Sequence, residues 1–180
     1  MKTSHTERAL ILAPTGRDSV IAAGVLAEAR IRSVACGSVD SLLCELDHGA
    51  GFVVATEEAL LGADLRPLSQ WIAKQPEWSD LPFVLLTHRG GGLERNPEAA
   101  RFLQALGNVT FLERPFHPTT LVSLGQSALR GRRRQYDARA RLEALQESED
   151  HFRHTVELNP QIAWTASPDG KLEQIAPRWT

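Results

Sequence analysis

Short apolar runs alternate with amphipathic stretches in the first part of the chain, up to about residue 116. Five of the apolar runs predict β-strands, at 9–13, 31–35, 52–55, 82–86 and 109–112. Between them, apolar residues recur at the spacing of one helix face and predict helices, over about 18–29, from Ser38 to Gly49, around 68–72 and from Asn96 to Gly107. Strands that alternate with helices are typical of a parallel sheet with crossover helices. The pattern therefore predicts a doubly wound α/β domain of five strands over residues 8–117.

The ends of the predicted helices carry residues that favour starting or ending a helix. A side-chain oxygen at a helix start can accept a backbone hydrogen bond, and glycine after a helix can take the left-handed conformation. The candidate caps are Asp18 or Ser19, Ser38 and Asn96, and the candidate end residues are Gly49, Gly51 and Gly107.

From Pro118 onward, apolar residues are spaced alternately by three and four, which is the a/d pattern of a coiled coil. The predicted seam residues are Leu121, Leu124, Ala128, Gln135, Ala138, Leu142, Leu145 and Phe152, together with Gly131, Glu149 and Val156. A helix of about 40 residues, over 118–158, would extend roughly 60 Å. We expect it to form a parallel homodimer, because its outer half has no sheet to pack against. The alternative is a single helix that folds back on its own domain.

The last residues, 159–180, contain two short runs with apolar residues, 162–166 and 172–175, on either side of Pro168-Asp169-Gly170. A Pro-Asp-Gly turn between two such runs predicts a β-hairpin. Because an isolated hairpin is only marginally stable in water, we expect it to be the start of a domain that this sequence does not complete.

Composition narrows the kinds of protein that this chain can be. Its 20 basic and 22 acidic residues nearly balance, which argues against a chain that coats nucleic acid or anionic membrane. No run approaches the roughly 20 apolar residues of a membrane span. Residues 1–8 lack the apolar core of a secretory signal, so we expect a cytoplasmic protein. Cys36 and Cys44 are too few for a disulfide scaffold or a four-ligand zinc site, and we expect both to be buried as small apolar residues.

The residues that end the predicted strands resemble those of receiver domains in bacterial two-component signalling. Thr87 ends the fourth strand, and Arg114-Pro115-Phe116 after the fifth is similar to the lysine-proline-phenylalanine element of that family. The resemblance covers about residues 8–130. It implies a flavodoxin-like receiver fold, in which two acidic residues after the first strand hold magnesium and an aspartate at the end of the third accepts a phosphoryl group.

Other positions depart from the pattern of that family. The first strand leads into Ala13 and Pro14 where the acidic pair would stand, and the acceptor position falls on Thr56. Magnesium prefers carboxylate oxygens, and transfer of a phosphoryl group to a carboxylate needs the metal to neutralise charge. We therefore expect a pseudo-receiver with no catalytic residue, no metal and no other cofactor. A register shifted by one residue would place Glu57 at the acceptor position, but its side chain would then lie on the other face of the sheet. We expect Glu57 instead to imitate a permanent charge beside Arg114.

Residues 147–160 resemble the lead-in helix of a PAS sensory domain, and the predicted hairpin with Arg178-Trp179 resembles the elements that follow it. A receiver-like domain, a coiled coil over 118–158 and a PAS start over 159–180 occur in the order of a sensor histidine kinase. The resemblance implies a non-catalytic regulatory and dimerisation module of such a kinase, with a protein partner that docks on the receiver-like face. The alternative is a docking platform for another signalling output, such as a cyclase or a hybrid response regulator.

Three further features do not predict chemistry. His151 and His154 are followed by Phe152 and Thr155, whereas the phospho-accepting histidine of a kinase has an acidic neighbour. Arginines between residues 130 and 141 form a basic cluster, but acidic residues follow within three turns. We interpret the cluster as a solvated helix surface and expect no nucleic acid partner. The glycines at 90–92 lack the Lys-Ser/Thr ending of a phosphate-binding loop.

Overall fold

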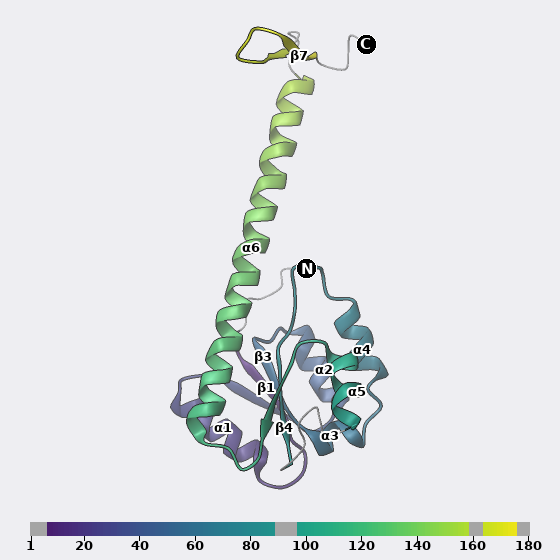
Figure 1. The fold of residues 1–180 in the computed structure, drawn as a ribbon, viewed down its shortest axis with the longest axis vertical. Coiled ribbons are helices and arrows are strands. Elements are labelled where there is room, and N and C mark those ends of the chain that lie inside the picture. The colour runs from purple at the N-terminus through teal and green to yellow at the C-terminus, as the bar shows by residue number, and fades with distance from the viewer. Residues whose placement is uncertain (1–6, 89–96, 159–163, 176–180) are drawn as a thin grey trace. The chain divides into compact units, whose positions relative to one another are not determined.

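The fold centres on one parallel β-sheet in the computed structural model, which describes residues 7–88, 97–158 and 164–175 (Figure 1). The strands of this sheet are β1 Ala9–Leu12, β2 Ser33–Cys36, β3 Phe52–Thr56, β4 Phe83–Thr87 and β5 Val109–Glu113. Their order is β2-β1-β3-β4-β5, and every neighbouring pair is parallel. This is the strand order of the flavodoxin-like doubly wound fold. The predicted five-stranded α/β fold is confirmed.

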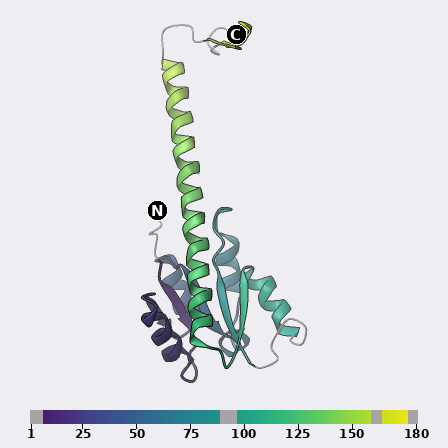
Figure 2. The ribbon, with the colours of Figure 1, turned by 60° about the vertical axis from the view of Figure 1, so that its left-hand side comes forward.

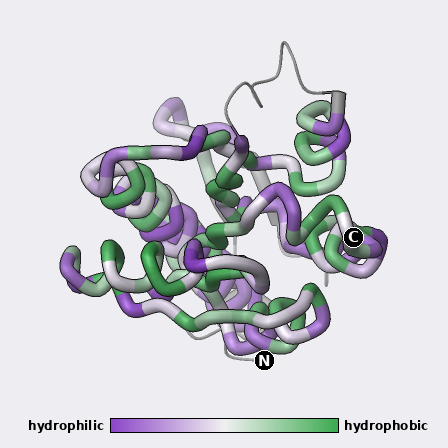
Figure 3. Tube along the Cα trace, turned by 90° about the horizontal axis from the view of Figure 1, so that it is seen from below, coloured by the Kyte–Doolittle hydropathy of each residue, from purple (hydrophilic) through white to green (hydrophobic). Residues whose placement is uncertain are grey.

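Helices cover both faces of this sheet. They are α1 Asp18–Glu28, α2 Val39–Asp47, α3 Glu57–Leu61, α4 Arg66–Ala73, α5 Pro97–Leu106 and α6 Pro118–Leu158. Helices α2 to α5 form one core with the strand residues that include Leu10, Val53 and Phe83, and α1 and the first part of α6 form another with Ile11 and Phe52. Successive residues of a strand face opposite sides of the sheet. Because helices cover both sides, β3 and β4 are buried along their whole length. Figure 3 shows hydrophobic stretches gathered toward the middle, where the strands lie.

Several predicted helix ends are found where the sequence places them. Ser38 caps α2: its Oγ accepts a hydrogen bond of 3.2 Å from the backbone N–H of Ser41, and the Ser41 hydroxyl accepts one from the N–H of Ser38. Gly49 after α2 and Gly107 after α5 have positive φ values, 90° and 73°. The predicted cap Asn96 lies outside the described residues.

The end of α1 explains why β2 begins later than predicted. The N–H of Arg30 donates to the carbonyl of Ala27, and the N–H of Ile31 donates to the carbonyl of Leu26, both at 2.9 Å. This Schellman motif keeps Ile31 in the helix end, so β2 starts at Ser33. Arg30 takes the left-handed position of the motif, with φ of 59°, where a non-glycine residue costs roughly 1 kcal/mol or more.

The short helix α3 is missing from the sequence prediction. It begins at Glu57, directly after β3, and ends at Leu61. One residue of α3, Leu60, is buried in the core at 1% exposure. A helix of 5 residues is little more than one turn, so the sequence holds no helical period from which it could be recognised. The helix predicted around 68–72 corresponds to α4.

The first part of α6 packs closely on the sheet. Leu121 and Leu129 lie in the same core as α1, and Figures 1 and 2 show the two helices side by side. Gly125 lies between these leucines, and a Cβ atom there would come within 2.9 Å of the Phe52 ring. Glycine therefore allows the helix backbone to approach the strand. The first compact unit of the chain runs to Tyr136 and so includes this part of α6.

The second compact unit, Asp137–Thr180, contains the outer part of α6 and a hairpin. The hairpin consists of β6 Trp164–Ala166 and β7 Leu172–Ile175, which pair antiparallel. Gly170 in its turn has a φ of 78°, which is a conformation that glycine adopts without strain. The predicted long helix and hairpin are confirmed.

Three smaller expectations have different outcomes. Cys36 is buried, but the expectation that Cys44 is buried is wrong: it lies on the exposed side of α2, between the buried Leu42 and Leu46. Predictions for residues 90–92, 159–163 and 176–180 fall outside the described residues. Over the part of the chain that the structure describes, no helix is both long and apolar enough to cross a membrane.

Candidate functional site

The carboxyl ends of the strands bring the predicted receiver positions to one edge of the sheet. Ala13 and Pro14 follow β1, Thr56 ends β3, Thr87 ends β4 and Arg114 follows β5. The parallel registers of β1 with β3, β3 with β4 and β4 with β5 place these strand ends next to one another. In open α/β sheets, ligands bind at this edge. It is therefore the candidate site.

Arg114 is the centre of the polar contacts at this edge. Its Nη1 donates to Oδ2 of Asp18, and its Nη2 donates to Oε1 of Glu58, both at 2.5 Å. The same Glu58 oxygen lies 2.8 Å from Nε2 of His88. The backbone N–H of Arg114 donates to the carbonyl of Thr87 at 2.9 Å. One guanidinium thereby joins the segments that follow β1 and β3, and it lies beside the end of β4.

Sequence reasoning did not find the partners of Arg114. The expectation that Asp18 caps α1 is wrong, because the N-cap residue is Arg17 and no side chain caps this helix. Asp18 lies in the first helical turn, where a carboxylate also benefits from the positive end of the helix dipole. Glu58 is adjacent to Glu57 in the sequence, and only the start of α3 at this point decides which of them faces the arginine.

The ion pair between Arg114 and Glu58 shifts the pKa values of both residues. Burial by itself raises the pKa of Glu58, but the hydrogen bond from Arg114 and the charges of Arg114 and His88 outweigh it, so the pKa lies below its ordinary value. Burial lowers the pKa of Arg114, whereas its bonds to Glu58 and Asp18 raise it by more. The site therefore holds a fixed positive charge between two carboxylates at neutral pH.

The acceptor position is occupied by Thr56, which is 1% exposed and whose hydroxyl has no hydrogen-bond partner among the described residues. The next residue, Glu57, is also buried, and its Oε2 accepts a long hydrogen bond of 3.4 Å from the backbone N–H of His88. The role of Glu57 as a permanent charge beside Arg114 stays a prediction. The ion pairs of Arg114 are formed with Asp18 and Glu58.

The residues at this edge do not fit a magnesium site. Mg²⁺ takes oxygen ligands in a nearly octahedral arrangement and usually binds one or two carboxylates. Ala13 and Pro14 have no side-chain oxygen, Thr56 offers a neutral hydroxyl, and the carboxylates of Asp18 and Glu58 are bonded to the guanidinium of Arg114. Within residues 7–88, 97–158 and 164–175, no three His, Cys, Asp or Glu side chains are grouped so that they could hold a metal ion.

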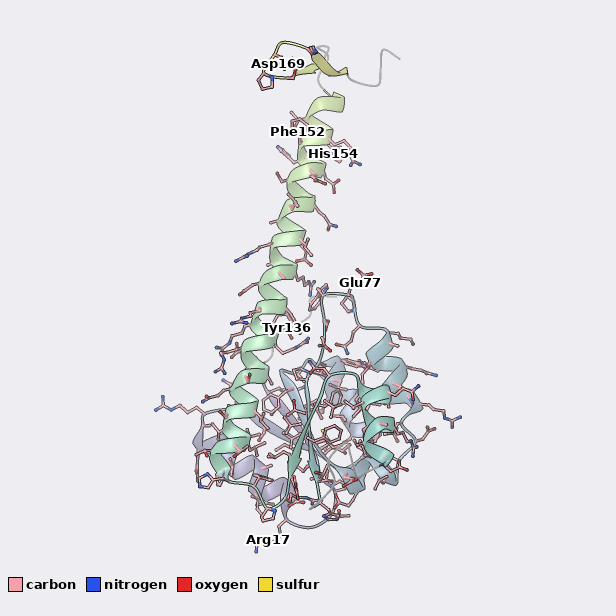
Figure 4. The ribbon with its side chains drawn as sticks, in the orientation of Figure 1. Arg17, Glu77, Tyr136, Phe152, His154 and Asp169 are labelled. Atoms are coloured by element: carbon pink, nitrogen blue, oxygen red, sulfur yellow. The ribbon has the colours of Figure 1, made fainter. Side chains whose placement is uncertain are left out.

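A second polar cluster joins α6 to the loop before β4, and we call it the α6 latch. The side-chain amide of Gln135 donates to the carbonyl of Asp80 and accepts from its N–H, each at 3.1 Å. Arg132, 7% exposed, donates to the hydroxyls of Ser79 at 3.0 Å and Tyr136 at 3.1 Å. Figure 4 labels Tyr136 on α6 and Glu77 in the loop that α6 contacts. The latch connects the loop between α4 and β4 to residues 132–136 of α6.

The predicted dimer seam divides into two parts. The first four residues contact the chain's own domain: Leu121, Leu124, Ala128 and Gln135. The outer four residues are exposed: Ala138, Leu142, Leu145 and Phe152. The exposed fraction is 55% for Leu142, 58% for Leu145 and 66% for Phe152. Figure 4 shows Phe152 extending from the outer part of α6. The inner seam residues therefore pack on the chain's own domain. The outer seam stays a prediction of a dimer contact.

Comparison by sequence gives little further information. No protein-family model matches the chain. Among curated proteins, the chain is 53% identical over 36 residues to y4lL, an uncharacterized protein of Sinorhizobium fredii. The match covers 20% of this chain and only 4% of the length of that relative. It assigns no function.

Comparison by structure shows the fold. A putative response regulator from Chloroflexus aurantiacus is 22% identical, with a TM-score of 0.55 over 68% of this chain and 97% of its own. NtrX from Brucella abortus is 18% identical, with a TM-score of 0.59 over 74% of this chain and 28% of its own. A receiver-modulated diguanylate cyclase from Pelobacter carbinolicus is 15% identical, with a TM-score of 0.53 over 73% and 99%. This chain therefore has a receiver-like domain with the fold of response regulators, followed by a long helix.

Proposed function

We propose that this chain is a non-catalytic regulatory and dimerisation module of a two-component sensor histidine kinase. The receiver-like domain is not phosphorylated, and α6 carries signals from it through a coiled coil to a PAS domain that begins with the hairpin. The observation that carries the proposal is the pair of carboxylates bonded to Arg114, at the edge where a receiver needs carboxylates for magnesium.

The chemistry of phosphoryl transfer supports a domain without this activity. Charge on the transferring group must be neutralised, which receivers achieve with a metal ion held by acidic residues. At this edge Asp18 and Glu58 hold Arg114, and Thr56 provides a hydroxyl, which cannot form an acyl phosphate. The domain would then respond to a protein that docks on it, and not to phosphorylation.

The α6 latch supports a route from the domain to the long helix. Gln135 and Arg132 are bonded to the loop before β4, so a partner that moves this loop would change how firmly the base of α6 is held. Packed helices shift between discrete arrangements, and rotation at one end of a coiled coil alters its packing further along. A partner that docks on the loop between α4 and β4 would act through this contact.

Phosphorylation is the direct test of the proposal. The chain is incubated with acetyl phosphate and Mg²⁺, and its intact mass is measured beside a receiver domain that has the full acidic set. We expect no added phosphate on this chain, and none on the variant Arg114→Lys, because Thr56 still occupies the acceptor position. A hydroxylamine-labile phosphate on the unmodified chain would contradict the proposal.

A second candidate function is a receiver-like docking platform for a different output. The structural likeness to a protein described as a receiver-modulated diguanylate cyclase favours it. The two candidates differ in the catalytic domain that α6 would control. Production of phosphohistidine from ATP by the full-length protein would support the kinase, and production of a cyclic dinucleotide from GTP would support the cyclase.

A further inference from the structure

A cavity of about 1140 Å³ lies at the opposite edge of the sheet from Arg114, near the starts of β1 and β2. Its walls come from the end of α1, from the segment that leads into β2, and from the first part of α6. One acidic residue, Glu7, lines the cavity together with five arginines: Arg8, Arg30, Arg32, Arg130 and Arg133. Positive charge is therefore concentrated in one concave place on a chain whose net charge is −2.

Two of these arginines are neutralised within the chain. Arg133 donates to both carboxylate oxygens of Glu7, each at 2.6 Å, and Arg8 lies 2.7 Å from a carboxylate oxygen of Glu45. The guanidinium groups of the remaining three have no hydrogen bond or ion pair with another described residue: Arg30, Arg32 and Arg130. Arg30 and Arg32 belong to the connection between α1 and β2, and Arg130 belongs to α6. Because all three line the same cavity, an anion there could interact with cations from both sides.

Arg30 occupies a backbone position that favours glycine. With φ of 59° it is the left-handed residue of the motif that ends α1. A cation at a helix C-terminus interacts favourably with the helix dipole, which would account for Arg30 alone. Arg130 lies on α6, about 100 residues further along the chain, so the end of α1 does not account for its presence in the same cavity.

The remaining surface of the cavity is largely apolar and includes Ala23, Ala27, Ile31 and Leu129. Guanidinium groups bind phosphate oxygens in pairs and also stack on flat rings. Binding sites for small ligands typically combine apolar walls with a few convergent polar groups, in volumes of about 300–1,000 Å³. A ligand that suits this surface has several phosphate charges and a flat, weakly polar part.

We infer that this cavity binds a nucleoside polyphosphate, with its phosphates on Arg30, Arg32 and Arg130 and its base against the apolar wall of Ala27 and Leu129. The site is separate from the edge at Arg114 and does not depend on the proposed function. Since α6 forms one wall, a bound nucleotide would also hold the base of this helix against the domain.

The test is calorimetric titration of the whole chain with ATP, GTP, tripolyphosphate and adenosine in Mg²⁺-free buffer at low salt. We expect both nucleotides to bind, tripolyphosphate to bind more weakly and adenosine to give no measurable heat. Arg30→Gly, Arg32→Gln and Arg130→Gln should each raise the Kd for the nucleotides roughly tenfold or more, because each removes a charge-assisted hydrogen bond. Arg17→Gln is the control, since Arg17 is an exposed arginine at the other end of α1 (Figure 4).

Arg30→Gly separates binding from folding. Glycine suits the backbone at this position, so the variant should have a higher melting temperature than the unmodified chain while it loses affinity. Absence of binding by both nucleotides at millimolar concentration would overturn the inference. Equal affinity for tripolyphosphate and ATP would overturn the assignment of a nucleoside, and equal weakening by Arg17→Gln would overturn the location.

Discussion

At the scale of single residues, Arg114 determines the electrostatics of the edge at which a receiver would bind its metal. Its side chain is 18% exposed, and its guanidinium lies between Asp18 and Glu58. Partly buried ion pairs are screened less by solvent than exposed ones, and loss of one partner leaves the others with an uncompensated charge. The consequences of changing Arg114 should therefore appear first in its carboxylate partners.

Replacement of Arg114 by methionine should raise the pKa of Glu58. Arg114 is the main cause that lowers this pKa, and burial, which raises it, remains in the variant. Titration of the glutamate and aspartate side-chain carboxyl carbons by NMR measures the effect. Arg66→Met is the matched control: Arg66 holds the pKa of the exposed Asp64 at about 2, so this change should move Asp64 toward 3.8 and leave Glu58 unaffected. An unchanged Glu58 titration in Arg114→Met would contradict the ion-pair assignment.

Glu58 should also make the stability of the domain depend on pH in acid. Its pKa in the folded chain lies below the ordinary value of 4.5, so its carboxylate stabilises the fold above that pH, and this contribution is lost as the pH falls through the folded pKa. Urea unfolding should therefore show Glu58→Gln less stable than the unmodified chain at pH 7, with the gap closing in acid. Glu77→Gln, in an exposed loop, controls for the loss of a charge. A gap that stays constant with pH would count against this account.

At the scale of helices and strands, local signals predicted most of the domain and failed where tertiary contacts decide. The apolar runs of β3 and β4 are sufficient to predict these two strands, and Ser38 is sufficient to predict the start of α2. The start of β2 depends on the hydrogen bond from Ile31 to Leu26, and α3 is too short to show a period. Because parallel strands end at the same edge of a sheet, the sequence was sufficient to place Thr56 and Arg114 there. No local pattern could indicate which carboxylates would bind the arginine.

The two glycines of α6 should respond to alanine in opposite directions. A Cβ atom at Gly125 would come within 2.9 Å of the buried Phe52 ring, whereas one at Gly131 would meet no atom within 4 Å. Gly131→Ala should stabilise the chain by up to about 1 kcal/mol through helix propensity. Gly125→Ala has the same gain but overpacks the core, which costs roughly 1–3 kcal/mol, so we expect net destabilisation. Chemical unfolding measures both, and stabilisation by Gly125→Ala would contradict the close approach of α6 to β3.

The α6 latch can be tested by hydrogen exchange. Gln135→Ala removes the acceptor of the Asp80 N–H, so exchange of this amide should become faster while amides within β3 keep their protection. Gln146→Ala, on the exposed outer part of α6, is the control and should leave Asp80 unchanged. Equal exchange at Asp80 in all three proteins would show that the latch does not hold the loop.

At the scale of the whole molecule, one heptad pattern serves two kinds of packing. Leu121 and Leu142 both occupy a positions and look alike in the sequence, but Leu121 is fully buried in its own domain and Leu142 is 55% exposed. A spacing of three and four requires an apolar partner without specifying which chain supplies it. The sequence therefore predicted the length of the helix, and only the fold shows where packing on its own domain ends.

The outer seam should make the chain a dimer. Leu142, Leu145 and Phe152 are large apolar residues exposed by more than half, at helical positions that align on one seam. Light scattering should give twice the mass of one chain at tens of micromolar, and Leu142→Lys with Leu145→Lys should give a monomer, since charge in an apolar seam is costly. Val20→Lys with Ile21→Lys, which alters exposed apolar residues of α1, is the control and should remain dimeric. A monomeric unmodified chain would exclude the coiled coil and leave α6 to transmit a signal as a single helix.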